Sequence, residues 1–254
     1  MKRSKYLILA IFTLVLAGCN EELVSVNTEV LIDITEEDLS QLRFEDVNEA
    51  ILYISKLDTS DVSHNKVCYS LTPISELTTN PQIGDCLKED DNKFDRSTGK
   101  RILDIKEFSE GINQNLDQLK KEVIRYGRDS TEVYKTIQNA LVSINRKSGI
   151  KHVLIFSDLL HHMNEFSFYE FKGKEESFTE ELIDDSYNRL QKHYPLPQDL
   201  SQIKISVIFQ PDVSTDRKFE LAKRWWTRVI KKHNGSIIFY SNVDALINNY
   251  NPRL

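Results

Sequence analysis

Glycine and proline, the residues that most often interrupt helices and strands, are scarce in this sequence. Its 254 residues include only eight glycines and six prolines, and no stretch rich in proline, glycine and serine separates one half from the other. Boundaries between domains usually fall in exposed segments of that composition. The absence of such a linker therefore favours a single domain.

The apolar run nearest the N-terminus is too short to span a membrane. Residues Tyr6–Leu16 number 11, whereas a transmembrane helix needs about 20 apolar residues. Three cations, Lys2, Arg3 and Lys5, precede the run. A positive segment followed by a short apolar one is typical of a secretion signal. We therefore expect residues 1–18 to be a signal peptide.

The run ends in Leu16-Ala17-Gly18-Cys19, which resembles the lipobox of bacterial lipoproteins. The resemblance implies that the Cys19 thiol receives a diacylglycerol and that the mature protein begins there. Each buried methylene of the lipid would contribute about 0.8 kcal/mol to anchoring. We expect a protein anchored to a cell-envelope membrane, outside the cytoplasm, with residues 19–27 as an acidic tether. The alternative is an ordinary secretory signal with a chance cysteine.

A surplus of positive charge is also absent. The formal charge of the whole chain is −6, and removal of the three signal cations leaves 30 positive and 39 negative side chains. Proteins that bind nucleic acids usually present a basic surface. We therefore expect no nucleic-acid partner.

Two cysteines remain once Cys19 is assigned to the lipid. Cys68 and Cys86 are an even pair, and their spacing does not match a CxxC metal motif. An oxidising compartment favours a disulfide, which would close a loop of about 18 residues and contribute on the order of 3 kcal/mol in the chain-entropy model. Two reduced, buried thiols are the alternative.

Strand-like and helix-like segments alternate along the remaining chain. Expected strands are residues 28–33, 66–72, 152–156, 203–209 and 236–240, and expected helices are residues 43–56, 105–126, 130–144, 176–193, 215–233 and 242–250. This alternation predicts an α/β domain over residues 28–254, with a doubly wound, mostly parallel sheet and helices on both faces. Residues 87–101 are polar without a period, which predicts an exposed loop.

Two expected strands end near a carboxylate. Asp33 follows an apolar strand directly, and Asp158 follows the strand that ends at Phe156. Between them in sequence, Ser130 and Thr131 open an expected helix. In a doubly wound sheet, ligands bind in the crevice beyond the carboxyl ends of the strands. These residues are therefore the candidates for a binding site.

The same residues resemble the von Willebrand factor type A (VWA) family, over residues 28–250. That family's metal-ion-dependent adhesion site uses Asp-x-Ser-x-Ser after the first strand, a threonine at a helix start and an aspartate after the fourth strand. The matching positions here are Asp33, Thr35, Glu37, Thr131 or its neighbour Ser130, and Asp158.

The resemblance implies a degenerate metal-ion-dependent adhesion site. Carboxylate, hydroxyl and water oxygens suit hard cations, which implies Mg²⁺, or else Mn²⁺ or Ca²⁺, as the ligand. Glu37 departs from the family pattern, because its long carboxylate stands where a serine is expected and could fill the position that a partner would use. The alternative is a site without metal, in which Asp33 and Asp158 are loop carboxylates.

The resemblance implies protein binding as the function. We expect a membrane-anchored VWA-like module that binds a partner protein of the cell envelope at the carboxyl ends of its strands. The alternative is a metal-free structural subunit of an envelope complex. An enzyme with Asp33 as nucleophile or base is disfavoured, because the sequence has no Asp-x-Asp pair after the first strand, no phosphate-binding Gly-x-x-x-x-Gly-Lys-Ser/Thr loop and no Gly-x-Ser-x-Gly elbow.

Two further patterns leave alternatives open. His161 and His162 follow Asp158 closely, but adjacent side chains point apart, so at most one would reach a shared ion. Trp225 lies on the flank of its helix, where it either fills the edge of the core or anchors a partner.

Overall fold

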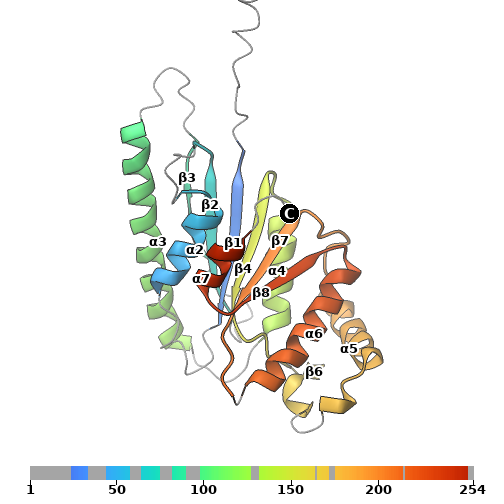
Figure 1. Ribbon diagram of the computed structural model, residues 1–254. Coiled ribbons are helices and arrows are strands. Elements are labelled where there is room, and N and C mark those ends of the chain that lie inside the picture. Colours follow the sequence, from blue (N-terminus) through green and yellow to red (C-terminus); the bar gives the residue numbers. More distant parts are fainter. Residues whose placement is uncertain are drawn as a thin grey trace, which may run out of the picture.

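The computed structural model describes residues 24–33, 44–57, 64–74, 82–89, 98–126, 132–163, 165–171, 175–213 and 215–250. In this part of the chain a six-stranded sheet lies between two layers of helices (Figure 1). Five of the six strands run parallel, and β3 alone is antiparallel to its neighbour. The predicted doubly wound α/β fold is therefore confirmed.

The order of strands across the sheet is β3-β2-β1-β4-β7-β8. These strands are β1 (Val26–Asp33), β2 (Val67–Ile74), β3 (Ile83–Leu87), β4 (Ile150–Phe156), β7 (Ile203–Ile208) and β8 (Ser236–Tyr240). A short hairpin, β5 (His162–Met163) and β6 (Phe166–Ser167), follows β4 and continues into the 3-10 turns η2 (Phe168–Phe171) and η3 (Glu175–Ser177). Because both faces of the central strand β1 are covered, residues 26–32 are all buried.

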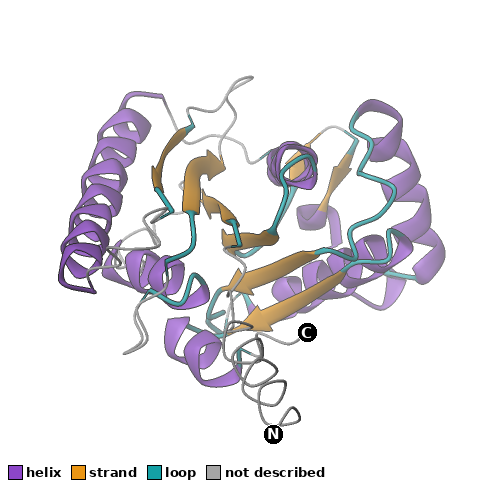
Figure 2. Cartoon of the chain, turned by 90° about the horizontal axis from the view of Figure 1, so that it is seen from above, coloured by secondary structure: helices purple, strands orange, loops and turns teal. Residues whose placement is uncertain are grey.

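Each face of the sheet carries its own core. On one face pack α2 (Phe44–Ile54), α3 (Thr98–Tyr126) and α7 (Val243–Asn249), and on the other pack α4 (Val133–Asn145), α5 (Glu180–His193) and α6 (Asp216–Lys232). Figure 2 shows the two helical layers on either side of the strands. Among the described residues, no helix combines the length and the apolar character that crossing a bilayer requires.

An aromatic cluster fills the core beneath α6. Trp225 and Trp226 are each 1% exposed, and the indole N–H of Trp225 donates to the Ser186 hydroxyl at 2.8 Å. Tyr134 and Phe166 stack on these two indoles. Trp225 therefore belongs to the core, and the alternative that it anchors a partner is wrong.

Several sequence-based boundaries differ from the structure; α5, for example, begins at Glu180 rather than at residue 176. The first strand begins at Val26, two residues before the expected domain start at residue 28. The edge strand β3 was not expected, and α3 begins at Thr98, inside the segment 87–101 that was expected to be a loop. Arg101, in that segment, is only 2% exposed, because its guanidinium donates to the carbonyl oxygens of Asn65 and Lys88, both at 2.6 Å.

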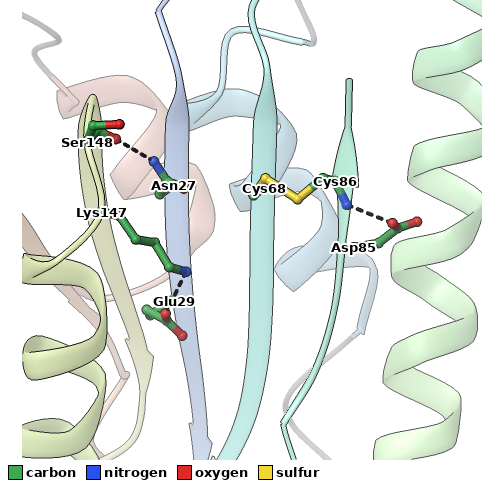
Figure 3. Close-up of a disulfide and its surroundings, with 7 residues drawn as sticks. All are labelled: Asn27, Glu29, Cys68, Asp85, Cys86, Lys147 and Ser148. Carbon is green, nitrogen blue, oxygen red and sulfur yellow. Dashed lines mark hydrogen bonds and ion pairs between the residues drawn. A yellow bond between two sulfur atoms is a disulfide. The ribbon is translucent and has the colours of Figure 1, made fainter. Parts of the chain in front are cut away.

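The disulfide between Cys68 and Cys86 is present, which confirms the predicted pairing. It joins β2 to β3 at positions that face each other directly in the antiparallel ladder (Figure 3). Cys68 is half-buried and Cys86 is exposed. The bridge therefore fastens the outermost strand to the sheet near the surface.

Candidate functional site

The carboxyl ends of β1 and β4 lie side by side, and this neighbourhood forms the candidate site. Ile32 and Phe156 are partners in the parallel ladder, so Asp33 and Ser157 follow at the same level. The Ser157 hydroxyl donates to Asp33 Oδ2 at 2.7 Å, and the Ser157 oxygen accepts from the Leu159 N–H at 2.9 Å. Ser157 therefore ties the half-buried Asp33 carboxylate to the loop that follows β4.

That loop holds a second carboxylate in a fixed orientation. Asp158 is 3% exposed, and its Oδ1 accepts a hydrogen bond from the Leu160 N–H at 2.8 Å. Leu159, between them, has a φ of 62°, a left-handed conformation that costs a bulky residue about 1–2 kcal/mol. Backbone strain of this kind tends to persist where the surrounding structure imposes it, and it clusters at functional sites.

His161 joins the same loop to the start of α4. The His161 ring is 2% exposed, and its Nδ1 accepts from the Tyr134 backbone N–H at 3.4 Å. The first N–H groups of a helix have no partner within it, so a side chain commonly accepts from one of them. His162, in contrast, is exposed and contacts Ser167. The two rings thus lie apart, and His161 orients the loop.

The structure brings together only some of the predicted site residues. Asp33 ends β1 and Asp158 follows the neighbouring strand β4 by two residues, so both lie at the carboxyl end of the sheet. The helix α4 begins at Val133, and His161 of the loop after β4 contacts its first turn. Thr35, Glu37, Ser130 and Thr131 lie outside the described residues, as does the predicted lipidation site Cys19. Ser157 and His161 were not assigned these roles from the sequence. The sequence did offer one signal for Ser157, because a hydroxyl residue directly before Asp158 could have been included among the candidate site residues.

The described residues supply part of the ligand set that a hard cation needs. Asp33 and Asp158 offer two carboxylates, whereas Mg²⁺ and Ca²⁺ take six or more oxygen ligands, some of them water. Within the described ranges, no group of three or more histidine, cysteine, aspartate or glutamate side chains could hold a metal ion. The two carboxylates fit the oxygen chemistry of a divalent cation, and the remaining predicted ligands fall on residues 35, 37 and 131.

A second polar cluster lies on the face of the sheet that α4 covers, nearer the strand starts. Glu29 in β1 is 1% exposed, and its Oε1 accepts from Lys147 Nζ at 2.9 Å and from the Ser143 hydroxyl at 3.0 Å. Its Oε2 accepts from the Gln82 side-chain amide at 3.2 Å. Nearby, the Asn27 amide donates to the Ser148 carbonyl at 2.8 Å (Figure 3). The bonds from Ser143, Lys147 and Ser148 tie the C-terminal end of α4 and the turn after it to β1.

Comparisons with known proteins do not assign a family. No family model and no curated protein matches the sequence. Among solved structures, proximal thread matrix protein 1 of the mussel byssus matches with a TM-score of 0.37 and 7% sequence identity, over 89% of this chain and 44% of that one. The chain thus spans less than half of that protein's length, and a likeness at this TM-score supports no functional argument.

Proposed function

We propose that this protein is a lipid-anchored component of the cell envelope that binds another envelope protein at the carboxyl ends of β1 and β4. The proposal assigns the anchor to Cys19 and the binding role to a VWA-like site around Asp33 and Asp158. The observation that carries it is the fixed junction of Asp33, Ser157 and the strained Asp158–His161 loop. No catalytic role is assigned to these residues.

A divalent cation is the proposed bridging group, and Mg²⁺ is the first candidate, with Mn²⁺ and Ca²⁺ as the others. Asp33 and Asp158 would hold it, together with Thr35, Glu37 and Thr131. The cation would supply a positive charge for an acidic side chain of the partner. One observation favours the metal-free alternative, a structural subunit: each carboxylate already accepts a hydrogen bond from the protein, Asp33 from Ser157 and Asp158 from the Leu160 N–H.

Thermal unfolding separates these two forms of the proposal. A cation that binds only the folded state raises the melting temperature by mass action. We expect millimolar Mg²⁺, Mn²⁺ or Ca²⁺ to raise it for the wild type, and Asp33→Ala to abolish the rise. Asp185→Ala, which removes an exposed carboxylate of α5, is the matched control and should keep the rise. No rise in the wild type, with partner binding intact in a chelator, would establish the metal-free form.

Site-specific photo-crosslinking in intact envelopes tests the binding role itself. A crosslinker at the exposed His162, four residues beyond Asp158, should capture a partner protein. A crosslinker at the exposed Ser201, at the opposite end of the strands, should not capture the same protein. Asp33→Ala should abolish capture from position 162. Equal capture from both positions, or capture that survives Asp33→Ala, would contradict a partner site at this end of the strands.

A further inference from the structure

The described chain enters the domain at the edge where the parallel strands start. Val24 lies two residues before β1, and its N–H donates to Asn65 Oδ1 at 2.9 Å. Arg101 then links Asn65 to Lys88 through its two carbonyl bonds, so three loops at this edge are joined to the entering chain. We call this end of the molecule the strand-start edge, formed by the described residues 24–25, 64–66, 88–89, 98–103 and 146–150.

The neighbouring strand fixes the entry point further. The Ile150 N–H donates to the Ser25 carbonyl at 2.8 Å, and Val26 donates to the Lys66 carbonyl at 2.8 Å. Gly149 has a φ of 86°, and a Cβ at that position would lie 2.1 Å from the Ser25 oxygen. Only glycine allows the two backbones to approach so closely. The entry of the chain is therefore a fixed point of the fold.

The distance from this fixed point to Cys19 is short. Five Cα–Cα steps separate Cys19 from Val24, which can span at most about 18 Å. The eight residues of β1 place the candidate site at the far end of the strand, about 26 Å from the strand-start edge at 3.3 Å per residue. If Cys19 carries the lipid, the strand-start edge lies near the bilayer.

Exposed apolar side chains gather at this edge. Three exposed large apolar side chains lie here: Ile102 and Leu103, which are 53% and 61% exposed in the second turn of α3, and Ile150, which is 41% exposed at the start of β4. Figure 1 shows that α3 begins at the same end of the molecule as β1, β2 and β4. Apolar side chains that insert at the acyl boundary strengthen the binding of an anchored protein.

Exposed cations lie at the same edge. They are Lys66, Lys88, Lys100 and Arg146, whereas Glu89 is the exposed carboxylate among the residues that define the edge. Residues 90–97, which lie outside the described part, add three aspartates, one lysine and one arginine. Cations near a bilayer are attracted to anionic headgroups.

We propose that the strand-start edge, with Ile102, Leu103 and Ile150, contacts the bilayer interface, so that the opposite end of the sheet, with Asp33 and Asp158, faces away from the membrane. This inference rests on the proposed lipid anchor at Cys19. A tether of 18 Å would by itself also allow the domain to lie on its side. The exposed apolar residues at the edge favour the upright orientation.

Depth measurements on the lipidated protein test the orientation. Cys19 is acylated and the other two cysteines are bridged, so a thiol introduced by Leu103→Cys, Ile150→Cys or Val213→Cys is the one reactive site for a fluorophore. Val213 is 100% exposed and lies beyond the carboxyl end of β7. In phosphatidylcholine–phosphatidylglycerol vesicles with a headgroup-attached quencher, we expect strong quenching at positions 103 and 150 and little at 213.

Two failures are distinguishable. A wild-type chain that carries no lipid and does not float with the vesicles would overturn the anchor and this inference together. A lipidated, floating chain in which the label at 213 is quenched as strongly as the label at 103 would overturn the orientation alone. With labels introduced instead by Lys88→Cys, at the strand-start edge, and by Val213→Cys, we expect stronger quenching at position 88 than at position 213. The triple variant Ile102→Ser, Leu103→Ser, Ile150→Ser should remain anchored and lose this difference, since the domain is then free to tilt.

Discussion

At the scale of single residues, Glu29 is the clearest case of a charge placed inside the fold. It lies in the middle of the central strand, and its ion-pair partner Lys147 is 33% exposed, so only one of the two charges is removed from water. An ion pair of similar length on α6, between Glu220 and Lys223, has side-chain exposures of 54% and 32%. The two lysines thus differ mainly in the burial of their partners.

We predict that Lys147→Met destabilises the protein by about 3–5 kcal/mol, because it leaves the buried Glu29 charge without its cation. Lys223→Met should cost less than about 1 kcal/mol, as for other exposed pairs. Glu29→Gln should cost less than Lys147→Met, since Lys147 can still be solvated. Urea unfolding of the three variants at pH 7 measures these differences. Equal losses for the two lysine variants would contradict the assigned role of Glu29.

His152 makes the stability depend on pH. It is 2% exposed on β4 and lies near Tyr250 and Lys204, and burial, with a smaller contribution from the Lys204 charge, lowers the pKa of His152 from 6.5 to about 4. The unfolded chain therefore binds a proton before the folded chain does as the pH falls. The contribution of neutral His152 to the free energy of unfolding is complete above pH 6.5. It is lost as the pH falls towards 4, which lowers the free energy of unfolding by roughly 3 kcal/mol.

We predict that His152→Gln removes this part of the acid sensitivity. The free energy of unfolding of the wild type should fall more steeply between pH 6.5 and 4.5 than that of the variant. His193→Gln, which changes an exposed histidine, is the control and should follow the wild type. Parallel pH profiles for the wild type and His152→Gln would show that another group causes the decline.

At the scale of elements, β3 is the strand whose own side chains contribute least to holding it in the sheet. It has five residues, of which Gly84, Asp85 and Cys86 are exposed. A Cβ at position 84 would lie 2.3 Å from the Tyr69 carbonyl oxygen, so the close approach to β2 requires glycine. The disulfide and the packing of α3 therefore hold this strand in place.

We predict that replacing both Cys68 and Cys86 by alanine lowers the free energy of unfolding by about 3 kcal/mol, the chain-entropy value for a loop of this length. For a chain of this size the melting temperature should fall by about 6–12 °C. Hydrogen exchange should show the largest loss of protection in β3. The single variant Cys68→Ala should cost about as much as the double variant, because either removes the loop closure, and an unchanged melting temperature would contradict the role given to the bridge.

The elements that the sequence predicted well are those with a strong hydrophobic period. The strand at residues 236–240 was predicted with the boundaries that the structure has, and α6 within one residue at each end. β3 gave no such signal, since its stability comes from β2, α3 and the disulfide. Residues 98–104 of α3 were also missed, because the helix was expected to begin at residue 105 and the stabilising contacts of this part are long-range hydrogen bonds from Arg101.

In the candidate site, too, some features have a local sequence signal and others depend on long-range contacts. Asp33 and Asp158 were predictable, because each follows an apolar strand in a chain whose alternation predicts a parallel sheet. The bond from Ser157 to Asp33 spans 124 positions, and the left-handed Leu159 has no signature in the residue type. Neither could be derived before the register of β1 against β4 was known.

At the scale of the whole molecule, the proposed anchor and the fold are separate parts with a short connection. We predict that Cys19→Ala leaves the protein either unprocessed or released from membranes, because this thiol is the proposed attachment site of the lipid. Acyl labelling combined with membrane fractionation measures both effects. An unlabelled wild type, or a Cys19→Ala protein that is still labelled and cleaved, would contradict the lipoprotein assignment.

The division of the core into two faces has a consequence for optical measurements on this protein. Both tryptophans lie in contact on one face, with ring centroids 5.0 Å apart, and the core on the α2–α3–α7 face contains neither. Tryptophan fluorescence, excited selectively above the tyrosine absorption band, therefore reports the environment under α6 and is insensitive to local opening of β3 and α3. A loss of helical dichroism that precedes the shift in emission would mark the disulfide-bearing side as the first to open.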